Sequence, residues 1–401
     1  MFPAKDPANG KCTADNFVNS SGQAETCTEF VYDRSVFSAT LSTELDLVCD
    51  LENRQKLLGT LLMLGILIGS VIGGWASDHF GRKRTMYAAA LVSVPALTAN
   101  GFATNYPTYA ALHFIYCTAI PILWMTNLTL NLELFSSRYK KVLLWTKCLM
   151  WTLCNLLMVL LAYVARTWTH QHVVLGVIGL LALATWPLIP ESPRWLAQNG
   201  RQAEARALML EIARANGESA AEDDEALDEL ISHVAAKAEQ ERMGEERRAP
   251  LTELFRPHFL TTTLILTSAW TMANAGYYTL SLHAASLHGD LFLNYALSFG
   301  INCAKAFMLW GAVERCGRRN VLAFAEAVVA VCCLALAFTP KERTTLVLVI
   351  FLVGNLCCAC TFNLCWFITP DFYPTNLRAQ GCTELSIISL SRSLIEQQTQ
   401  L

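Results

Sequence analysis

Two motifs of one type lie far apart in this 401-residue chain. Each motif contains, in order, an acid, two variable residues, a glycine and two bases. The first runs from Asp78 to Lys83 and the second from Glu314 to Arg319. The glycines are Gly81 and Gly317, and the first bases after them are Arg82 and Arg318. Glycine permits a tight turn between helices, and acid–base pairs beside it can close in one conformation and open in another. Anchoring of basic loops alone would explain the bases but not the acid and the glycine.

A second pair of motifs repeats with nearly the same offset. Glu133 precedes Arg138, and Asp371 precedes Arg378, after two other apolar runs. The acids of the first motif lie 236 residues apart and those of the second 238 residues apart, which follows from their numbers in the chain. Two different motifs sharing one offset indicate duplicated halves, as in transporters built from parallel repeats.

The elements that position these motifs are long apolar runs. Hydrophobic residues make up 53% of the chain and charged residues 16%, whereas soluble chains carry about 25% charged residues. Runs of about 20 apolar residues are long enough to cross a bilayer. The sequence therefore predicts an all-α polytopic membrane protein. Nine membrane segments are expected, at 56–76, 85–104, 107–131, 142–164, 171–190, 259–281, 291–312, 320–340 and 344–369.

Every second loop between these segments is rich in lysine and arginine, so the basic loops all lie on the same side of the membrane. We interpret that side as the cytosol. The long polar insert between the fifth and sixth segments is expected to form surface helices, with helical spacing from Gln202 to Ala215. The expected organisation is an external segment (1–55), an N-terminal membrane half (56–196), a cytosolic linker (197–257), a C-terminal membrane half (258–380) and a tail (381–401). In the first membrane segment, Gly65, Gly69 and Gly73 form a small-residue stripe that predicts close helix packing.

Three of the fifteen cysteines, Cys12, Cys27 and Cys49, lie in the polar N-terminal stretch and are disulfide candidates. Asn19 begins an N-glycosylation motif there. The other cysteines lie in or beside apolar runs and are expected to act as small buried hydrophobes. No metal site, cofactor or catalytic set is predicted, because no Cys/His cluster, phosphate-binding loop or triad spacing is found. A net charge of −3 gives no indication of nucleic-acid binding.

Several further stretches resemble the major facilitator superfamily, and within it the organic cation, anion and carnitine transporter family. They are Tyr32–Phe37, Ser42–Cys49, Gly74–Arg84, Pro190–Leu196, Leu254–Arg256 and Pro374 with Thr375 and Arg378. The resemblance implies the major facilitator fold, a small organic ion as substrate, transport by alternating access and a plasma-membrane location. We expect the acids, glycines and bases of the two repeated motifs to form a conformational latch on the cytosolic side, and the resemblance adds Glu191 and Arg194 to it. In the family's order, the nine segments correspond to helices two to ten, so we expect the first helix and the last two to be missing or incomplete.

The resemblance also directs attention to four substrate-binding candidates. Trp270, Tyr277 and Tyr278 resemble aromatic positions of the family's cavity, and aromatic faces attract organic cations or stack on planar anions. Lys305 is expected near mid-membrane, where a base costs about 3 kcal/mol and usually serves function or pairs with an acid. A lysine near this position goes with organic-anion substrates in the family. The alternatives are packing for the aromatic residues and a paired or snorkelling lysine.

The leading interpretation is therefore a carrier of small organic ions in a lipid bilayer, and not an enzyme. The rival interpretation is a truncated product that does not transport but binds weakly or regulates a full-length partner. A receptor is a third option, against which the nine segments and the duplicated motif argue. The substrate, the coupling ion and the oligomeric state stay open.

Overall fold

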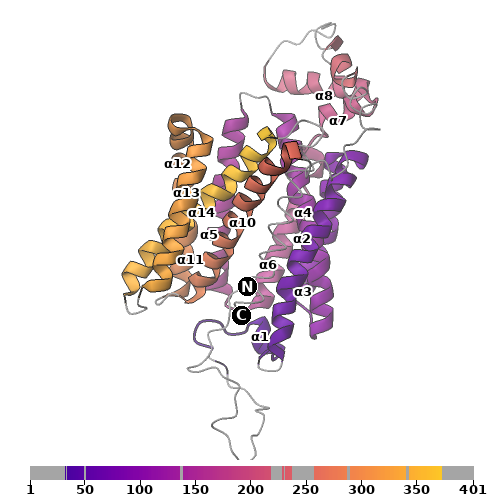
Figure 1. The fold of residues 1–401 in the computed structure, drawn as a ribbon. Helices are drawn as coiled ribbons and strands as arrows, with labels where there is room; N and C mark the ends of the chain where they lie inside the picture. Colours follow the sequence, from indigo (N-terminus) through magenta and orange to yellow (C-terminus); the bar gives the residue numbers. More distant parts are fainter. Residues whose placement is uncertain are drawn as a thin grey trace, which may run out of the picture.

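The computed structural model describes residues 32, 34–48, 51–135, 139–217, 228–229, 231–236, 257–286, 290–339 and 343–372. The elements in these residues are helices (Figure 1), apart from one parallel bridge between Ala39 and Thr167. The expected external cysteines Cys12, Cys27 and Cys49 and the glycosylation site Asn19 lie outside the described residues.

Each predicted apolar segment corresponds to one or two helices in the described part of the chain. The helices are α2 (Glu52–Phe80), α3 (Arg82–Asn100), α4 (Tyr106–Leu134), α5 (Lys140–Ala165), α6 (Trp168–Leu183), α10 (Pro257–Ser286), α11 (Leu291–Gly300), α12 (Asn302–Cys316), α13 (Arg318–Phe338) and α14 (Thr344–Phe372). Among the residues that the structure describes, 6 spans are long and apolar enough to cross a membrane; they lie within α2, α4, α5, α6–η3, α13 and α14, where η3 is Trp186–Leu188. The prediction of an all-α membrane fold is confirmed. One predicted segment, 291–312, is divided between α11 and α12 at Ile301.

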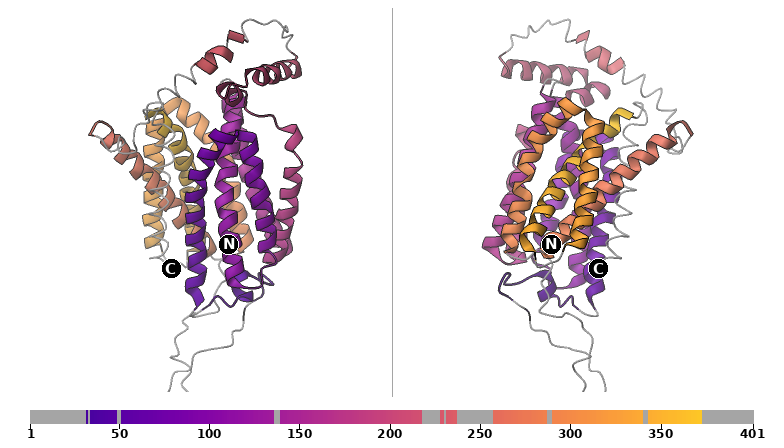
Figure 2. Two further views of the ribbon diagram at one scale, coloured as in Figure 1. Left: turned by 90° about the vertical axis from the view of Figure 1, so that its right-hand side faces the viewer. Right: turned by 60° about the vertical axis from the view of Figure 1, so that its left-hand side comes forward.

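The helices pack as two groups that lie side by side (Figures 1 and 2). We call α2, α3, α4 and α6 the N-terminal bundle, and α10 to α14 the C-terminal bundle. Helix α5 packs against α6 of the first and against α11 and α12 of the second. It therefore forms the junction between the bundles.

The glycine stripe of α2 explains how closely α2 and α4 approach. A Cβ on Gly65 would lie 2.8 Å from Cys117 Cβ, and a Cβ on Gly69 would lie 2.6 Å from Pro121 Cγ. On Gly73 it would lie 3.0 Å from Ile122 Cα. The predicted close packing is confirmed, and its partner is α4.

Two short helices lie at one end of the bundles, which we call the α7 end (Figure 1). They are α7 (Pro193–Gln198) and α8 (Gln202–Ala215). The bounds of α8 match the helical spacing of the sequence, because its apolar residues form one face. Ala205 on that face is buried in a cluster with Leu196 of α7 and with Ile231.

At the opposite end, a strap of residues 37–48 contains α1 (Leu41–Glu44). Leu41 and Leu47 are buried against Leu58 and Trp168 of the N-terminal bundle. Ser38 N–H donates to Arg166 O at 2.9 Å, next to the bridge between Ala39 and Thr167. The strap is therefore fastened to the turn between α5 and α6.

The two acid–glycine–base motifs adopt the same backbone turn. Gly81 ends α2 and precedes α3 with φ 101° and ψ 159°. Gly317 ends α12 and precedes α13 with φ 78° and ψ 153°. The repeat inferred from sequence spacing is thus also a repeat of local structure.

Candidate functional site

The turn at Gly81 strongly favours glycine. Its φ of 101° is one that L side chains rarely adopt, and a Cβ there would lie 2.6 Å from Glu191 Oε2. The absent side chain lets the Glu191 carboxylate reach the first turn of α3. Glu191 Oε1 accepts hydrogen bonds from Lys83 N–H at 2.9 Å and from Ser192 N–H at 3.0 Å. A carboxylate at this position stabilises the positive end of α3.

Arg82, the next residue, joins three segments at the α7 end. Its Nε and Nη2 atoms donate to Glu133 Oε2 and Oε1 of α4 at 3.1 and 3.2 Å. Nη2 also lies 3.1 Å from Asp78 Oδ1, and Nη1 donates to Ser77 O at 2.9 Å. The Arg82 and Glu133 side chains are only 8% and 11% exposed. Such a two-pronged, buried pair fixes direction as well as distance.

Trp195 of α7 attaches the linker to the same cluster. Its indole Nε1–H donates to Asp78 O, the carbonyl at the end of α2, at 2.9 Å. The indole is 5% exposed. We call Asp78, Gly81, Arg82, Glu133 and Glu191 the motif cluster.

The other latch candidates do not all join this cluster. Arg194 is exposed and has no ion pair in the described part of the chain. Arg318 is exposed at the turn of the second motif, where a Cβ on Gly317 would meet no atom within 4 Å. The side chains of Glu314 and Asp371, together with Arg138 and Arg378, lie outside what the structure describes.

The substrate candidates occupy different environments. Trp270 of α10 is fully buried with Leu266, Ala269 and Leu364 and packs edge-on against Phe362 at 5.8 Å, so it forms core. Tyr277 is 37% exposed and stacks on Phe362 at 6.3 Å. The side chain of Tyr278 is outside the described set.

Lys305 lies in α12, near the middle of the α11–α12 segment, and is 5% exposed. No hydrogen bond or ion pair joins it to any other residue that the structure describes. Helix α12 packs against α14 and against α5, the helix that contains Cys148. Cys148 Sγ lies 3.9 Å from Asn363 Oδ1, also of α14.

A second lysine at this junction was missed by the sequence analysis. Lys147 lies two turns into α5, with its Nζ 5.4 Å from the centre of the Trp124 ring of α4. Trp124 in turn stacks on Trp151 of α5 at 6.1 Å. The signal was a base inside a predicted apolar segment, seven residues after the cluster of bases that begins α5. We call Lys147 and Cys148 of α5, Lys305 of α12 and Asn363 of α14 the α5 junction.

Comparison with known proteins gives a consistent picture. A model of the family described as sugar (and other) transporter matches residues 15–388. The organic cation transporter protein of Drosophila melanogaster is 26% identical over 396 residues, covering 96% of this chain and 72% of that protein. The beta-alanine transporter of Drosophila melanogaster is 27% identical over 365 residues, covering 90% and 59%. Human organic cation/carnitine transporter 2 is 27% identical over 379 residues, covering 93% and 66%.

Among solved structures, the inward-open xylose transporter XylE from E. coli superposes with a TM-score of 0.69 at 15% identity. The match covers 90% of this chain and 83% of that one. At this identity the likeness establishes the fold alone. The chain thus shares a transporter fold, while spanning between 59% and 72% of the three curated relatives compared above.

Proposed function

The chain belongs to the sugar (and other) transporter family of the major facilitator superfamily, and we propose that it carries small organic ions across the membrane by alternating access. The family places it among multi-pass membrane transporters rather than enzymes. Its relatives include proteins named for organic cations, carnitine and beta-alanine.

The observation that carries the substrate proposal is the position of Lys305. A buried base at mid-membrane is costly and is retained for function or held by an acid. No acid holds Lys305 among the described residues. Lys305 lies on α12, which packs against α14 of the C-terminal bundle and against α5. An anionic group of a substrate is the counter-charge that this position lacks.

Lys147 and the aromatic pair extend the same argument. Lys147 supplies a second positive charge from α5. Trp124 and Trp151 offer flat faces beside it, and such faces suit the cationic or planar part of a substrate. We therefore propose substrates with a carboxylate and a further polar or planar group. Carnitine and β-alanine, for which two relatives are named, each carry a carboxylate together with a nitrogen cation.

The motif cluster is proposed to act as a conformational latch at the cytosolic side. It joins the end of α2, the start of α3, the end of α4 and the segment before α7 through buried, directional bonds. Bistable contacts of this kind convert small shifts into rigid-body motion of packed helices. The distribution of basic loops supports a cytosolic α7 end, and the plasma membrane is the proposed location.

Uptake by cells that express this chain tests the proposal. A panel of labelled carnitine, β-alanine, an aromatic monocarboxylate and tetraethylammonium should give saturable uptake of at least one carboxylate above the empty-vector level. Surface biotinylation in parallel measures delivery. Full delivery without uptake of any probe would contradict the proposal and favour a chain that binds or regulates without transporting.

A further inference from the structure

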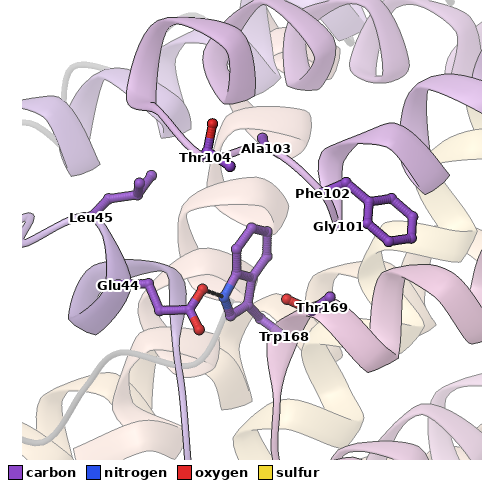
Figure 3. Close-up of a pocket in the computed structure, with 8 residues that line it drawn as sticks. All are labelled: Glu44, Leu45, Gly101, Phe102, Ala103, Thr104, Trp168 and Thr169. Atoms are coloured by element: carbon purple, nitrogen blue, oxygen red, sulfur yellow. Dashed lines mark hydrogen bonds between the residues drawn. The ribbon is translucent and has the colours of Figure 1, made fainter.

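A polar contact at the strap lies beside an open hollow in the surface. The Glu44 carboxylate accepts the Trp168 indole N–H at 2.7 Å, and the Phe102 ring turns away from both side chains (Figure 3). This contact fastens the strap to α6, and the hollow beside it is open. A polar contact between two helices of the C-terminal bundle has a different consequence, because it lies at the interruption between α11 and α12.

This interruption is a break in the backbone hydrogen bonds of the segment. The Ile301 N–H donates to Leu297 O, four residues back, at 3.0 Å, whereas the Ala304 N–H donates to Ile301 O, only three residues back. Between them, within the described structure, the Asn302 N–H makes no helical bond to the Ser298 carbonyl. Ile301 keeps right-handed helical angles, so the bonding is broken without a reversal of the chain.

Two side-chain amides take the place of the missing backbone donor. Asn302 Nδ2 and Asn355 Nδ2 each donate to Ser298 O at 3.0 Å. Asn302 belongs to the same segment, whereas Asn355 belongs to α14. Ser298 and Asn355 are 4% and 8% exposed, so both are largely shielded from solvent. A carbonyl oxygen has two lone pairs, and the two amides occupy both.

The amide from α14 is what distinguishes this place in the chain. Asn155 of α5 and Asn274 of α10 also donate to the carbonyl four residues back, at 2.7 and 3.0 Å, as Asn302 does. Both of those helices continue through the bond. Gly300 precedes the break, but glycine alone is not sufficient, since the glycine stripe lies within the uninterrupted α2. The contact from Asn355 therefore sets the α11–α12 segment apart.

The break lies one turn before Lys305. Lys305 follows Asn302 by three residues in α12 and is 5% exposed. A contact that holds the break also sets the direction of the turn that carries Lys305. Asn302 Oδ1 is buried and has no hydrogen-bond partner among the described residues, and a buried polar atom left in this state costs stability. A local cost that is retained beside a candidate site favours a role in function.

We propose that Asn355 is a positioning residue for Lys305, which acts through the carbonyl of Ser298 and the interruption at Ile301. The inference rests on the proposed role of Lys305 in holding the carboxylate of a substrate, and it adds a residue of α14 that does not itself touch the substrate. Replacement of the amide by an apolar side chain frees the Ser298 carbonyl for the Asn302 N–H. The helical bonding then continues through Ile301, and the turn that carries Lys305 changes direction.

Hydrogen–deuterium exchange of the full chain in lipid nanodiscs tests whether Asn355 holds the break. Peptides that contain residues 299–305 are followed by mass spectrometry. In Asn355→Leu the Asn302 N–H gains a helical partner, so we expect its exchange to slow by about fivefold or more, as one hydrogen bond allows. Asn355→Ala also lacks the amide and should give the same result with a smaller side chain. Asn302→Leu should keep the break, because a local amide of this kind leaves other helices continuous.

Uptake kinetics test whether the break positions Lys305. The KM for a labelled carboxylate should rise by about two- to tenfold in Asn355→Leu, the range of one hydrogen bond, while the maximal rate per surface molecule stays the same. The rise should be smaller in a Lys305→Arg background, because both changes act on one contact. Thr361→Val is the matched control, since it removes a buried hydroxyl of α14 that donates to Cys358 O within the same helix at 2.8 Å. It should leave both exchange and KM unchanged.

The two measurements separate this inference from the proposed function. Unchanged exchange in Asn355→Leu, or exchange slowed equally in Thr361→Val, would overturn the inference even in a chain that takes up no probe. An equal rise in KM with Lys305 and with Lys305→Arg would also overturn it, since Asn355 would then act independently of Lys305. Absence of uptake by the unaltered chain would contradict the proposed function instead, and exchange would still decide what holds the break.

Discussion

Arg82 and Glu133 form a buried, two-pronged ion pair, with Nε 3.1 Å from Oε2 and Nη2 3.2 Å from Oε1. The pair ties the start of α3 to the end of α4. Its arginine also contacts Asp78, which is 73% exposed and so remains accessible to a further partner. The Arg82 guanidinium thus joins one partner in the interior to one at the surface.

Removal of this arginine should destabilise the protein and impair transport. Arg82→Ala leaves Glu133 buried without a partner, and breaking a buried pair costs about 3 kcal/mol or more. We expect a lower melting temperature and reduced uptake per surface molecule. Arg84→Ala is the control, because Arg84 is exposed on the same turn. Equal melting temperatures of the two variants would contradict the role given to Arg82.

Gly81→Ala should lower the stability of the protein for two reasons, the unfavourable backbone angle and a clash with Glu191. A φ of 101° disfavours any L side chain, and the new Cβ would press on Glu191 Oε2. The backbone part alone costs about 1–3 kcal/mol, because φ 101° with ψ 159° lies in a region that is essentially restricted to glycine. Gly74→Ala serves as the control, since a Cβ there meets nothing within 4 Å. Thermal unfolding in detergent should separate the two variants, and similar melting curves would show that the turn tolerates a side chain.

Lys147 is expected to contribute to substrate affinity. Lys147→Ala removes a charge beside Trp124, so the KM for a carboxylate substrate should rise by about three- to tenfold, the range of a partly screened charge contact. Lys147→Arg keeps the charge and should restore most of the affinity. Concentration-dependent uptake measures both. An unchanged KM in Lys147→Ala would exclude Lys147 from the site.

The strap offers a direct test of relative motion between the bundles. Phe37 of the strap packs against Phe292 of α11, with ring centroids 5.5 Å apart. A bifunctional thiol cross-linker between Phe37→Cys and Phe292→Cys should block uptake if the two sides must move apart during the cycle. Each single cysteine variant, treated in the same way, is the control. Full uptake in a cross-linked protein would argue against rocking motion at this end.

Much of the fold could be predicted because bilayer thickness constrains segment length and hydropathy. The bounds of α8 followed from its helical spacing, and the repeated turn followed from the motif offset. The interruption at Ile301 could not be predicted from the sequence, because hydropathy averaged over a whole segment does not reveal a break at a single residue. Ile301 keeps right-handed helical angles, so the division between α11 and α12 is a local distortion.

The site was less predictable, because spacing gives a residue's depth but not which neighbour it faces. Trp270 could equally line a cavity or fill the core, and tertiary packing puts it in the core. The bond from Glu191 to the Lys83 amide joins residues 108 apart, so no local pattern reveals it. Lys147 was not recognised as a candidate because it closely follows the bases at the start of α5, which are typical of a membrane edge.

Charge reversal at Lys305 tests the central claim most directly. Uptake of a labelled carboxylate substrate identified with the probe panel should be lost in Lys305→Glu at normal surface delivery, while Lys305→Arg retains a measurable fraction. The reason is that an acid at this buried position would repel the carboxylate that the lysine is proposed to hold. Unchanged carboxylate uptake in Lys305→Glu, with normal delivery and an unaltered KM, would contradict the account.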